Sequence, residues 1–223
     1  MPVRSISVLT AGLLLALTGC AGGGDTDSTG SASQPESSPS TSGPSFTAFA
    51  DFPGEELLYV EQGVVPVGLR LKAVDTAWQT ELAGEIAEVG AHYLVIYVAV
   101  TGEADDRGVA GAWFNYFDFE LVFPTVDSAC APSSVDAYGA CVAKPITKIE
   151  QVADGEWRDH MWVSADTAGT VDLPAGATMI GALAFQILDD AELEADLQFC
   201  ARGRDVATRD NCITVPAPEE PRG

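Results

Sequence analysis

Residues 92–101 read HYLVIYVAVT, and the eight side chains from Tyr93 to Val100 in this stretch are all apolar. Neighbouring side chains of a strand point to opposite faces, so a strand of this composition is apolar on both faces. We therefore predict that this strand runs through the middle of the protein.

Further strands are predicted on either side of this stretch. Residues 68–74 alternate between apolar and mostly polar side chains, which is typical of a strand with one wet face, whereas residues 179–188 are again apolar on both faces. Shorter strands are predicted at 113–123, 146–152, 156–164, 193–199 and 211–215. Residues 76–90 contain Gly84 within a roughly helical spacing, and we expect a loop or a short edge element there. Turn signals are frequent and long helical patterns are lacking, so we predict an all-β fold, an antiparallel β-sandwich of seven to nine strands.

Residues 1–20 have the layout of an export signal, with Arg4 near the start, an apolar run and then small residues. The apolar run is shorter than the roughly 20 residues of a membrane-spanning helix. The last four residues, Leu17 to Cys20, resemble the lipobox of bacterial lipoproteins. The resemblance implies cleavage after Gly19, attachment of a diacylglycerol to Cys20 and a mature chain held at a membrane surface. The alternative is an ordinary secretory signal with an incidental cysteine.

The composition divides the chain into four parts. The signal peptide at 1–19 is followed at 20–45 by a lipid-anchored linker rich in Gly, Ser, Thr and Pro, which we expect to be flexible. The β-sandwich domain is predicted at 46–216. Residues 217–223 are polar and rich in proline, and we expect a disordered tail there.

Four of the five cysteines lie in the predicted domain: Cys130, Cys141, Cys200 and Cys212. An even number in an exported domain favours disulfides, and four cysteines allow three pairings. We prefer Cys130 with Cys141 and Cys200 with Cys212, because each pair brackets a short polar turn. A four-thiolate zinc site is disfavoured, because zinc-binding cysteines usually pair two to four residues apart.

Two segments of the domain carry a further resemblance. The run at 93–101 followed by a polar loop, and LPAGATMIGALAF at 173–185, are similar to the telokin-like, immunoglobulin-like extracellular domains of Gram-positive lipoproteins. The resemblance implies an immunoglobulin-like sandwich in a family of largely unassigned activity, and it brings no catalytic residues. The chain departs from that pattern at Gly102, where an asparagine is expected, and in its four domain cysteines.

The chain carries 33 acidic and 11 basic residues, which give a formal net charge of −22. Cleavage of residues 1–19 removes Arg4 and changes this charge to −23. Such a charge repels phosphate backbones and anionic lipid headgroups. We therefore predict that the protein does not bind nucleic acid.

Residues typical of catalytic sites are scarce. The sequence has two histidines, His92 and His160, and it lacks a Gly-x-Ser-x-Gly elbow, a His-Glu-x-x-His motif and a glycine-rich phosphate loop. His160 follows Asp159, but adjacent residues of a strand point to opposite faces and do not bond to each other. We predict neither an enzyme nor a cofactor.

Two acidic clusters keep a calcium site as an alternative. Glu103, Asp105 and Asp106 lie in one loop. The second cluster comprises Asp189, Asp190, Glu192, Glu194 and Asp196. Calcium takes oxygen ligands, and extracellular modules bind it weakly in such loops. No Asp-x-Asp-x-Asp-Gly loop is present and Arg107 adjoins the first cluster, so solvated loops are favoured.

Strand alternation along 113–123 places Trp113 and Phe117 on the core face and Phe114 and Tyr116 on the other face. Along 156–164, alternation likewise places Trp162 opposite Trp157. Aromatic side chains on a wet sheet suit a protein or glycan contact, so Phe114, Tyr116 and Trp162 form a candidate partner surface. The alternative is that a loop or a disulfide-tied segment covers this face.

These observations indicate a lipid-anchored protein on the extracytoplasmic face of the cell membrane. We expect it to act by binding, with an envelope protein or a glycan as its partner. A calcium-responsive structural module is the first alternative, and a carboxylate-based enzyme is the second.

Overall fold

The computed structural model describes residues 46–61, 65–123, 129–165, 170–193 and 195–219. The described residues belong to one compact unit and form strands and short 3-10 helices, without an α-helix among them. None of the described helices has the length and apolar character that crossing a membrane requires. The export signal, Cys20 and the linker lie outside the described residues.

The first sheet contains β1 (Glu56–Glu61), β2 (Val67–Gln79), β5 (Ala91–Gly102) and β10 (Met179–Leu188). Its strands are ordered β1-β2-β5-β10, and each neighbouring pair is antiparallel. The strand predicted at 92–101 is β5, which lies between β2 and β10 and is buried along almost its whole length. Its central position confirms the prediction.

The second sheet contains β7 (Phe119–Val122), β8 (Cys141–Val142), β11 (Asp196–Ala201) and β12 (Cys212–Pro216), in the order β12-β11-β7-β8. Two further pairs are β3 (Glu81–Leu82) with β4 (Glu85–Ile86), and β6 (Val109–Trp113) with β9 (Thr170–Leu173). The 3-10 helices are η1 (Phe49–Asp51), η2 (Tyr116–Asp118), η3 (Pro132–Ser134), η4 (Glu156–Arg158) and η5 (Thr208–Asp210).

The fold is the predicted all-β antiparallel sandwich, although the described residues form twelve strands rather than seven to nine. The extra strands are short: β3, β4 and β8 have two residues each. The backbone N–H of Ala217 donates to the carbonyl oxygen of Ala195 at 2.8 Å. Hydrogen bonding therefore continues past residue 216, where the tail is predicted to begin.

Alternation along β5 explains how both faces of this strand are apolar. Side chains at even positions from Leu94 to Val100 enter a core between the two four-stranded sheets, and those at odd positions from Tyr93 to Ala99 enter a second core on the opposite face. Apolar side chains of the second sheet, including Phe119, close the first core.

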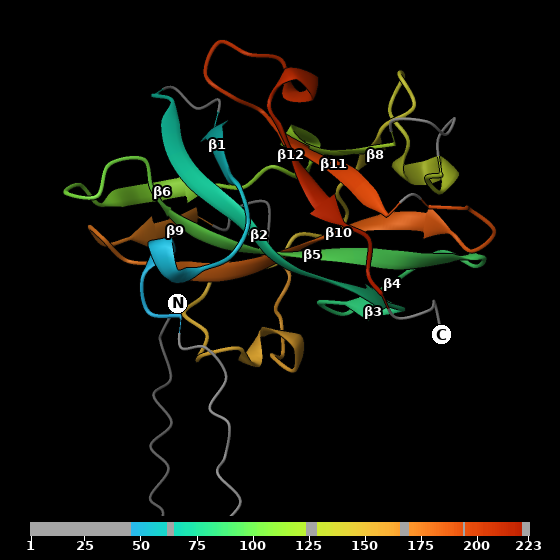
Figure 1. Ribbon diagram of the computed structural model, residues 1–223, viewed down its shortest axis with the longest axis horizontal. Coiled ribbons are helices and arrows are strands. Elements are labelled where there is room, and N and C mark those ends of the chain that lie inside the picture. Colours follow the sequence, from blue (N-terminus) through green and yellow to red (C-terminus); the bar gives the residue numbers. More distant parts are fainter. Residues whose placement is uncertain (1–45, 62–64, 124–128, 166–169, 194, 220–223) are drawn as a thin grey trace, which may run out of the picture. The chain divides into compact units, whose positions relative to one another are not determined.

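Irregular chain, rather than a sheet, closes the second core. Phe49 of η1, Leu82 of β3 and the two tryptophans Trp157 and Trp162 pack against this face of β5 and β10. Phe46 extends the cover, because its ring centroid lies 5.7 Å from that of Trp157. In Figure 1, β11 and β12 lie on one side of β5 and η4 lies on the other. The central strand is thus covered by two different kinds of structure.

The segment that carries the two tryptophans differs from the sequence prediction. Short strands are predicted at 146–152 and 156–164, whereas the structure has isolated bridges and the 3-10 helix η4 in this region. Gly155, with a φ of 72°, turns the chain into η4. Because the strand period is lost there, both tryptophans reach the same core instead of facing opposite ways.

Asp75 of β2 fastens η4 to the first sheet. Its carboxylate accepts hydrogen bonds from Nε1 of Trp157 at 3.0 Å and from Nη2 of Arg158 at 2.8 Å. Burial raises the pKa of the Asp75 carboxyl, but these hydrogen bonds and the charge of Arg158 lower it by more, so the pKa lies below its ordinary value. The carboxylate therefore stays ionised at neutral pH and keeps both donors.

The two disulfides have the pairing that the turn spacing favours, Cys130 with Cys141 and Cys200 with Cys212. Closing a loop of this length contributes about 3 kcal/mol in the chain-entropy model.

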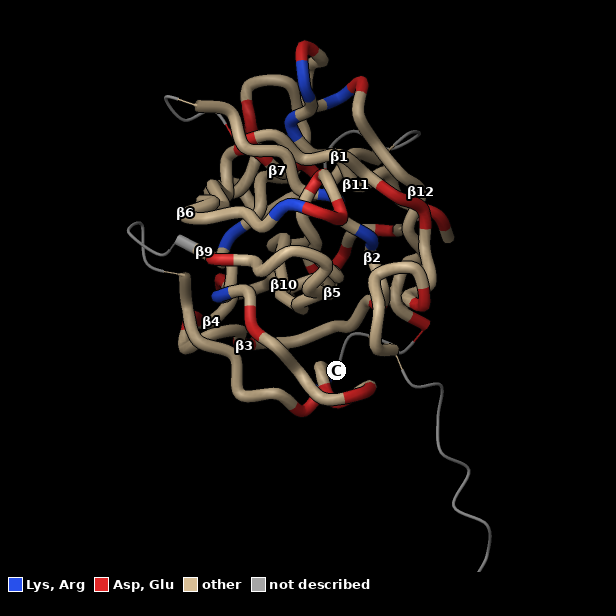
Figure 2. Tube along the Cα trace, turned by 90° about the vertical axis from the view of Figure 1, so that its left-hand side faces the viewer, with Lys and Arg blue, Asp and Glu red and all other residues tan. Residues whose placement is uncertain are grey.

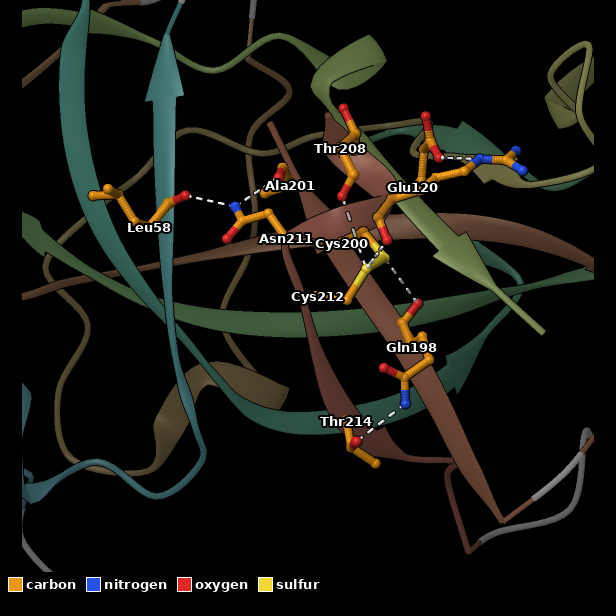
Figure 3. Close-up of a disulfide and its surroundings, with 10 residues drawn as sticks. Leu58, Glu120, Gln198, Cys200, Ala201, Thr208, Asn211, Cys212 and Thr214 are labelled. Carbon is orange, nitrogen blue, oxygen red and sulfur yellow. Dashed lines mark hydrogen bonds and ion pairs between the residues drawn. A yellow bond between two sulfur atoms is a disulfide. The ribbon is translucent and has the colours of Figure 1, made fainter. Parts of the chain in front are cut away.

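A side-chain amide beside the second disulfide joins the two sheets. Cys200 and Cys212 are direct partners across β11 and β12. The side-chain nitrogen of the neighbouring Asn211 donates to the carbonyl oxygens of Leu58 and Ala201, each at 2.8 Å (Figure 3). Since Leu58 belongs to β1 and Ala201 to β11, this amide ties the edge of the first sheet to the second sheet.

Gly54 offers a test of how tightly the chain packs against β2. It has a φ of +96°, and a Cβ at this position would lie 2.4 Å from the carbonyl oxygen of Ala73. We expect Gly54→Ala to lower the free energy of unfolding by about 2 to 4 kcal/mol, because a left-handed backbone and an overpacked contact both disfavour alanine. Urea denaturation measures the loss.

Gly84→Ala is the matched control for this substitution. Gly84 also has a positive φ, +82°, but nothing lies within 4 Å of a Cβ built there. Its replacement therefore carries only the backbone cost of about 1 to 2 kcal/mol. Equal losses in the two variants would contradict the steric explanation.

Candidate binding groove

A groove with a volume of about 260 Å³ opens where the connection from β6 to β7 meets the chain that follows β8. Glu85 and residues 113–116, 144–146 and 164–165 line it. We call it the aromatic groove, because Trp113, Phe114 and Tyr116 lie on its walls. Its volume is near the lower end of ligand pockets, roughly 300 Å³.

A 3-10 turn shapes the aromatic side of the groove. The side-chain oxygen of Asn115 accepts a hydrogen bond from the backbone N–H of Phe117 at 3.2 Å and so caps η2. The turn interrupts the strand alternation between β6 and β7. As a result Trp113 is 40% exposed and Phe117 is 59% exposed, although the sequence pattern assigns both to the core face.

The structure corrects the predicted partner surface at Phe114. This side chain is only 6% exposed, and its ring packs on Tyr59 at 5.2 Å and on Phe119 at 5.7 Å between centroids. Phe114 therefore belongs to the first core and forms the inner wall of the groove. Tyr116 is half-buried and lines the groove beside it.

Trp162 is a second correction, because it is 8% exposed and belongs to the second core. Its Nε1 donates to the carbonyl oxygen of Trp157 at 3.1 Å, and its ring lies 6.3 Å from that of Tyr97. The irregular chain around η4 covers it, as the alternative of a covered face anticipates. Of the three predicted residues, only Tyr116 thus combines partial exposure with a place in the groove.

The buried hydroxyl of Tyr59 contacts the backbone of the segment that forms the aromatic wall of the groove. It lies 3.0 Å from the carbonyl oxygen of Trp113 and 3.2 Å from the carboxylate of Asp118, and the backbone N–H of Asn115 points at it from 3.5 Å. Arg202 pairs with Asp118 at 3.0 Å. One buried hydroxyl therefore holds both ends of the Trp113–Asn115 segment.

Burial shifts the proton equilibria of this network. It raises the pKa of the Asp118 carboxyl above its ordinary value, although the charge of Arg202 opposes the shift. Burial and the nearby Asp118 carboxylate also raise the pKa of the Tyr59 hydroxyl. Tyr59 therefore stays protonated at neutral pH and acts as a hydrogen-bond donor.

Polar groups form the rim of the groove. The Nζ of Lys144 donates to the carbonyl oxygen of Ser133 at 3.2 Å and lies 6.0 Å from the centroid of the Tyr116 ring. Within the described chain, the side-chain nitrogen of Asn115, the hydroxyl of Ser164 and the carboxylate of Glu85 have no hydrogen-bond partner. The groove thus combines aromatic walls with donors and acceptors available to a ligand.

Sequence reasoning missed Trp113, Asn115 and Lys144 as groove residues. Asparagine is a frequent cap of a helical turn, so Asn115 is the one local signal that could have broken the predicted strand at 113–123. Nothing near Lys144 in the sequence indicates that it faces a loop about 30 residues earlier. Only the fold brings these segments together.

The two histidines lie outside the groove, each against a carboxylate. His160 pairs with Glu150 at 3.0 Å rather than with its neighbour Asp159. His92 pairs with Asp189 at 2.6 Å.

In the first of the acidic clusters considered for calcium, two of the three carboxylates pair with arginines. Glu103 pairs with Arg204 at 2.6 Å, and Asp105 pairs with Arg70. Figure 2 shows acidic positions spread along the described trace, with fewer basic positions among them. In the part of the chain that the structure describes, no group of three or more His, Cys, Asp or Glu side chains is placed to hold a metal ion, and Glu194 lies outside that part.

Comparison with family models, with curated proteins and with solved structures finds no match for this chain. The resemblances to lipoproteins and to telokin-like domains therefore stay predictions from the sequence. The geometry of the groove is the basis for assigning a function.

Tyr59→Phe tests the support of the groove. Removing the hydroxyl leaves the Trp113 carbonyl and the Asp118 carboxylate short of a donor, so we expect a loss of about 1 to 3 kcal/mol in the free energy of unfolding. We also expect faster amide hydrogen exchange at residues 113–118, because their segment loses its central contact.

Tyr93→Phe serves as the control, because Tyr93 is also buried but its hydroxyl makes no hydrogen bond to a described residue. It should leave exchange at 113–118 unchanged. If the two variants exchange alike in this segment, Tyr59 does not position the groove.

Proposed function

We propose that this protein is a lipid-anchored binding module of the cell envelope that contacts its partner through the aromatic groove. The observation that carries this proposal is the exposure of Trp113 beside the half-buried Tyr116, in a groove that is also lined by the polar side chains of Asn115, Lys144 and Ser164. Exposed aromatic side chains in a concave site are typical of binding surfaces.

The rigidity of the groove supports a binding role. Trp113 is held through its carbonyl oxygen by Tyr59, and its backbone N–H donates to the carboxylate of Glu61 at 3.2 Å. Asn115 fixes the turn that follows. A backbone that is already ordered loses little conformational entropy when a partner binds, so more of the contact energy appears as affinity.

The predicted anchor agrees with a module that waits for a partner near the membrane. Acyl chains on Cys20 would hold the chain at the bilayer, with two or more chains giving a stable anchor. A flexible linker over 21–45 would span roughly 25 to 30 Å. The negative charge of the protein opposes close approach to anionic headgroups. The groove would then face partners in the envelope rather than the lipid.

Cys20→Ser tests the anchor. The thiol is the group to which the lipid would be attached, so we expect the variant to leave the membrane fraction or to accumulate unprocessed. Fractionation of cells followed by mass spectrometry of the N-terminus measures both outcomes. A variant that stays processed and membrane-bound would overturn the anchor.

A photo-crosslinking residue at position 117 tests the groove as the contact surface. The Phe117 ring is exposed and its centroid lies 4.2 Å from that of Tyr116, so a benzophenone side chain there would reach a molecule in the groove. We expect irradiation of intact cells to give a discrete adduct. Met161, which is 87% exposed and is not a lining residue of the groove, is the matched control position. The same adducts at both positions, or none at 117, would contradict the proposal.

A further inference from the structure

The walls and rim of the aromatic groove differ in chemistry in a way that restricts the ligand. Trp113 and Tyr116 contribute aromatic rings to the lining, whereas Asn115, Lys144 and Ser164 contribute polar atoms, and Lys144 Nζ lies over the Tyr116 ring at 6.0 Å from its centroid. A ligand that matches both needs an apolar face and a ring of hydrogen-bonding groups around it. A pyranose sugar has this form, because its C–H groups lie on its faces and its hydroxyls lie around its perimeter. A lipid chain would leave the polar atoms desolvated without partners.

Several main-chain groups of the segment from Gly111 to Phe117, which carries the aromatic wall of the groove, are already hydrogen-bonded. The N–H of Gly111 donates to the carboxylate of Asp172 at 2.7 Å, and the N–H of Trp113 donates to Glu61. The carbonyl oxygen of Trp113 accepts from Tyr59, and the N–H of Phe117 is taken by Asn115. Strand addition depends on free main-chain groups, so these hydrogen bonds disfavour it and favour recognition through side chains.

The charges at the groove favour an uncharged ligand. Glu85 and Lys144 contribute one negative and one positive charge to its lining. An anionic ligand would meet Glu85 and a protein of net charge −22, and a cationic ligand would meet Lys144. A hydroxyl can donate to the carboxylate and accept from the ammonium, so sugar hydroxyls satisfy both groups.

We propose that the aromatic groove binds an uncharged sugar ring, so that the partner of this protein is a glycan. This assignment rests on the proposed binding function and names its ligand class. The volume of about 260 Å³ fits one or two rings rather than a long segment. Lys144 Nζ has one donor directed at the Ser133 carbonyl, which leaves two for the ligand.

Tryptophan fluorescence provides a direct test, because Trp113 is the most exposed of the four tryptophans. The mature lipidated protein is reconstituted in phosphatidylcholine vesicles and titrated with tetrasaccharides of N-acetylglucosamine, glucose, mannose and xylose. We expect at least one of these to give a saturable change with a Kd of about 1 mM or lower, the range expected of a small site. Deacetylated and uronic-acid tetrasaccharides, which are cationic and anionic, should bind at least tenfold more weakly.

Substitutions in the groove show whether the fluorescence change arises from sugar bound there or from an effect elsewhere in the protein. Trp113→Ala removes the exposed ring face, and Lys144→Met removes the ammonium while it keeps most of the side-chain length. Each should raise the Kd about tenfold or more, as measured by calorimetry where the fluorescent residue is lost. Trp78→Phe, outside the groove lining, should bind as the wild type does. The melting temperature of each variant shows that it is folded, and Lys144→Met decides the test if Trp113→Ala does not fold.

The outcomes also separate this inference from the proposed function. If none of the uncharged tetrasaccharides binds, or if Lys144→Met binds the sugar as the wild type does, the sugar assignment is wrong. A position-specific protein adduct from residue 117 together with no sugar binding would keep the groove as a binding site and reject the glycan. Absence of both sugar binding and adducts would reject the binding function itself.

Discussion

The burial of β5 on both faces is the constraint on which the rest of the structure depends. A strand with Leu94, Ile96 and Val98 on one face and Tyr93, Val95 and Tyr97 on the other is stable only between two apolar layers. One sheet cannot provide both layers. The chain therefore builds a second sheet against one face and wraps irregular segments over the other, and the order of the remaining elements follows from that division.

The aromatic groove lies beside the edge strand of the first sheet. Beyond β10, the chain from Lys144 to Glu150 continues the sheet through hydrogen bonds, with Lys144 N–H donating to Ala184 at 2.6 Å and Thr147 N–H to Ala182 at 3.0 Å. This pairing protects an edge that would otherwise expose free main-chain groups. The same segment supplies the Lys144 side of the groove, so one stretch of chain both closes the sheet and contributes polar atoms to the groove lining.

The sequence predicts those parts of this structure that follow from strand alternation or from the spacing of residues around a turn. The double-sided strands β5 and β10, the burial of Leu69 and Leu71 and both disulfide pairs follow from local patterns. Prediction failed at η2 and at η4, where a 3-10 turn interrupts the alternation of inward and outward side chains. There alternation assigned Trp113 to the core and Trp162 to the surface, whereas the structure exposes the first and buries the second. The placement of Trp113 and the Lys144 segment around one groove depends on tertiary structure, which no local pattern records.

Tyr59 couples the stability of the core to the geometry of the groove. Its ring is fully buried and packs at a tilt against Phe114 and Phe119, while its hydroxyl lies within hydrogen-bond distance of the Trp113 carbonyl and the Asp118 carboxylate. Because a buried carboxylate is costly without partners, Asp118 keeps the hydroxyl and Arg202 in place. The backbone of Trp113 at the groove is therefore held by interactions that also hold β1 against the second sheet. The aromatic groove has few regular elements around it, but its backbone at Trp113 and Asn115 is anchored in the core rather than only within the loop.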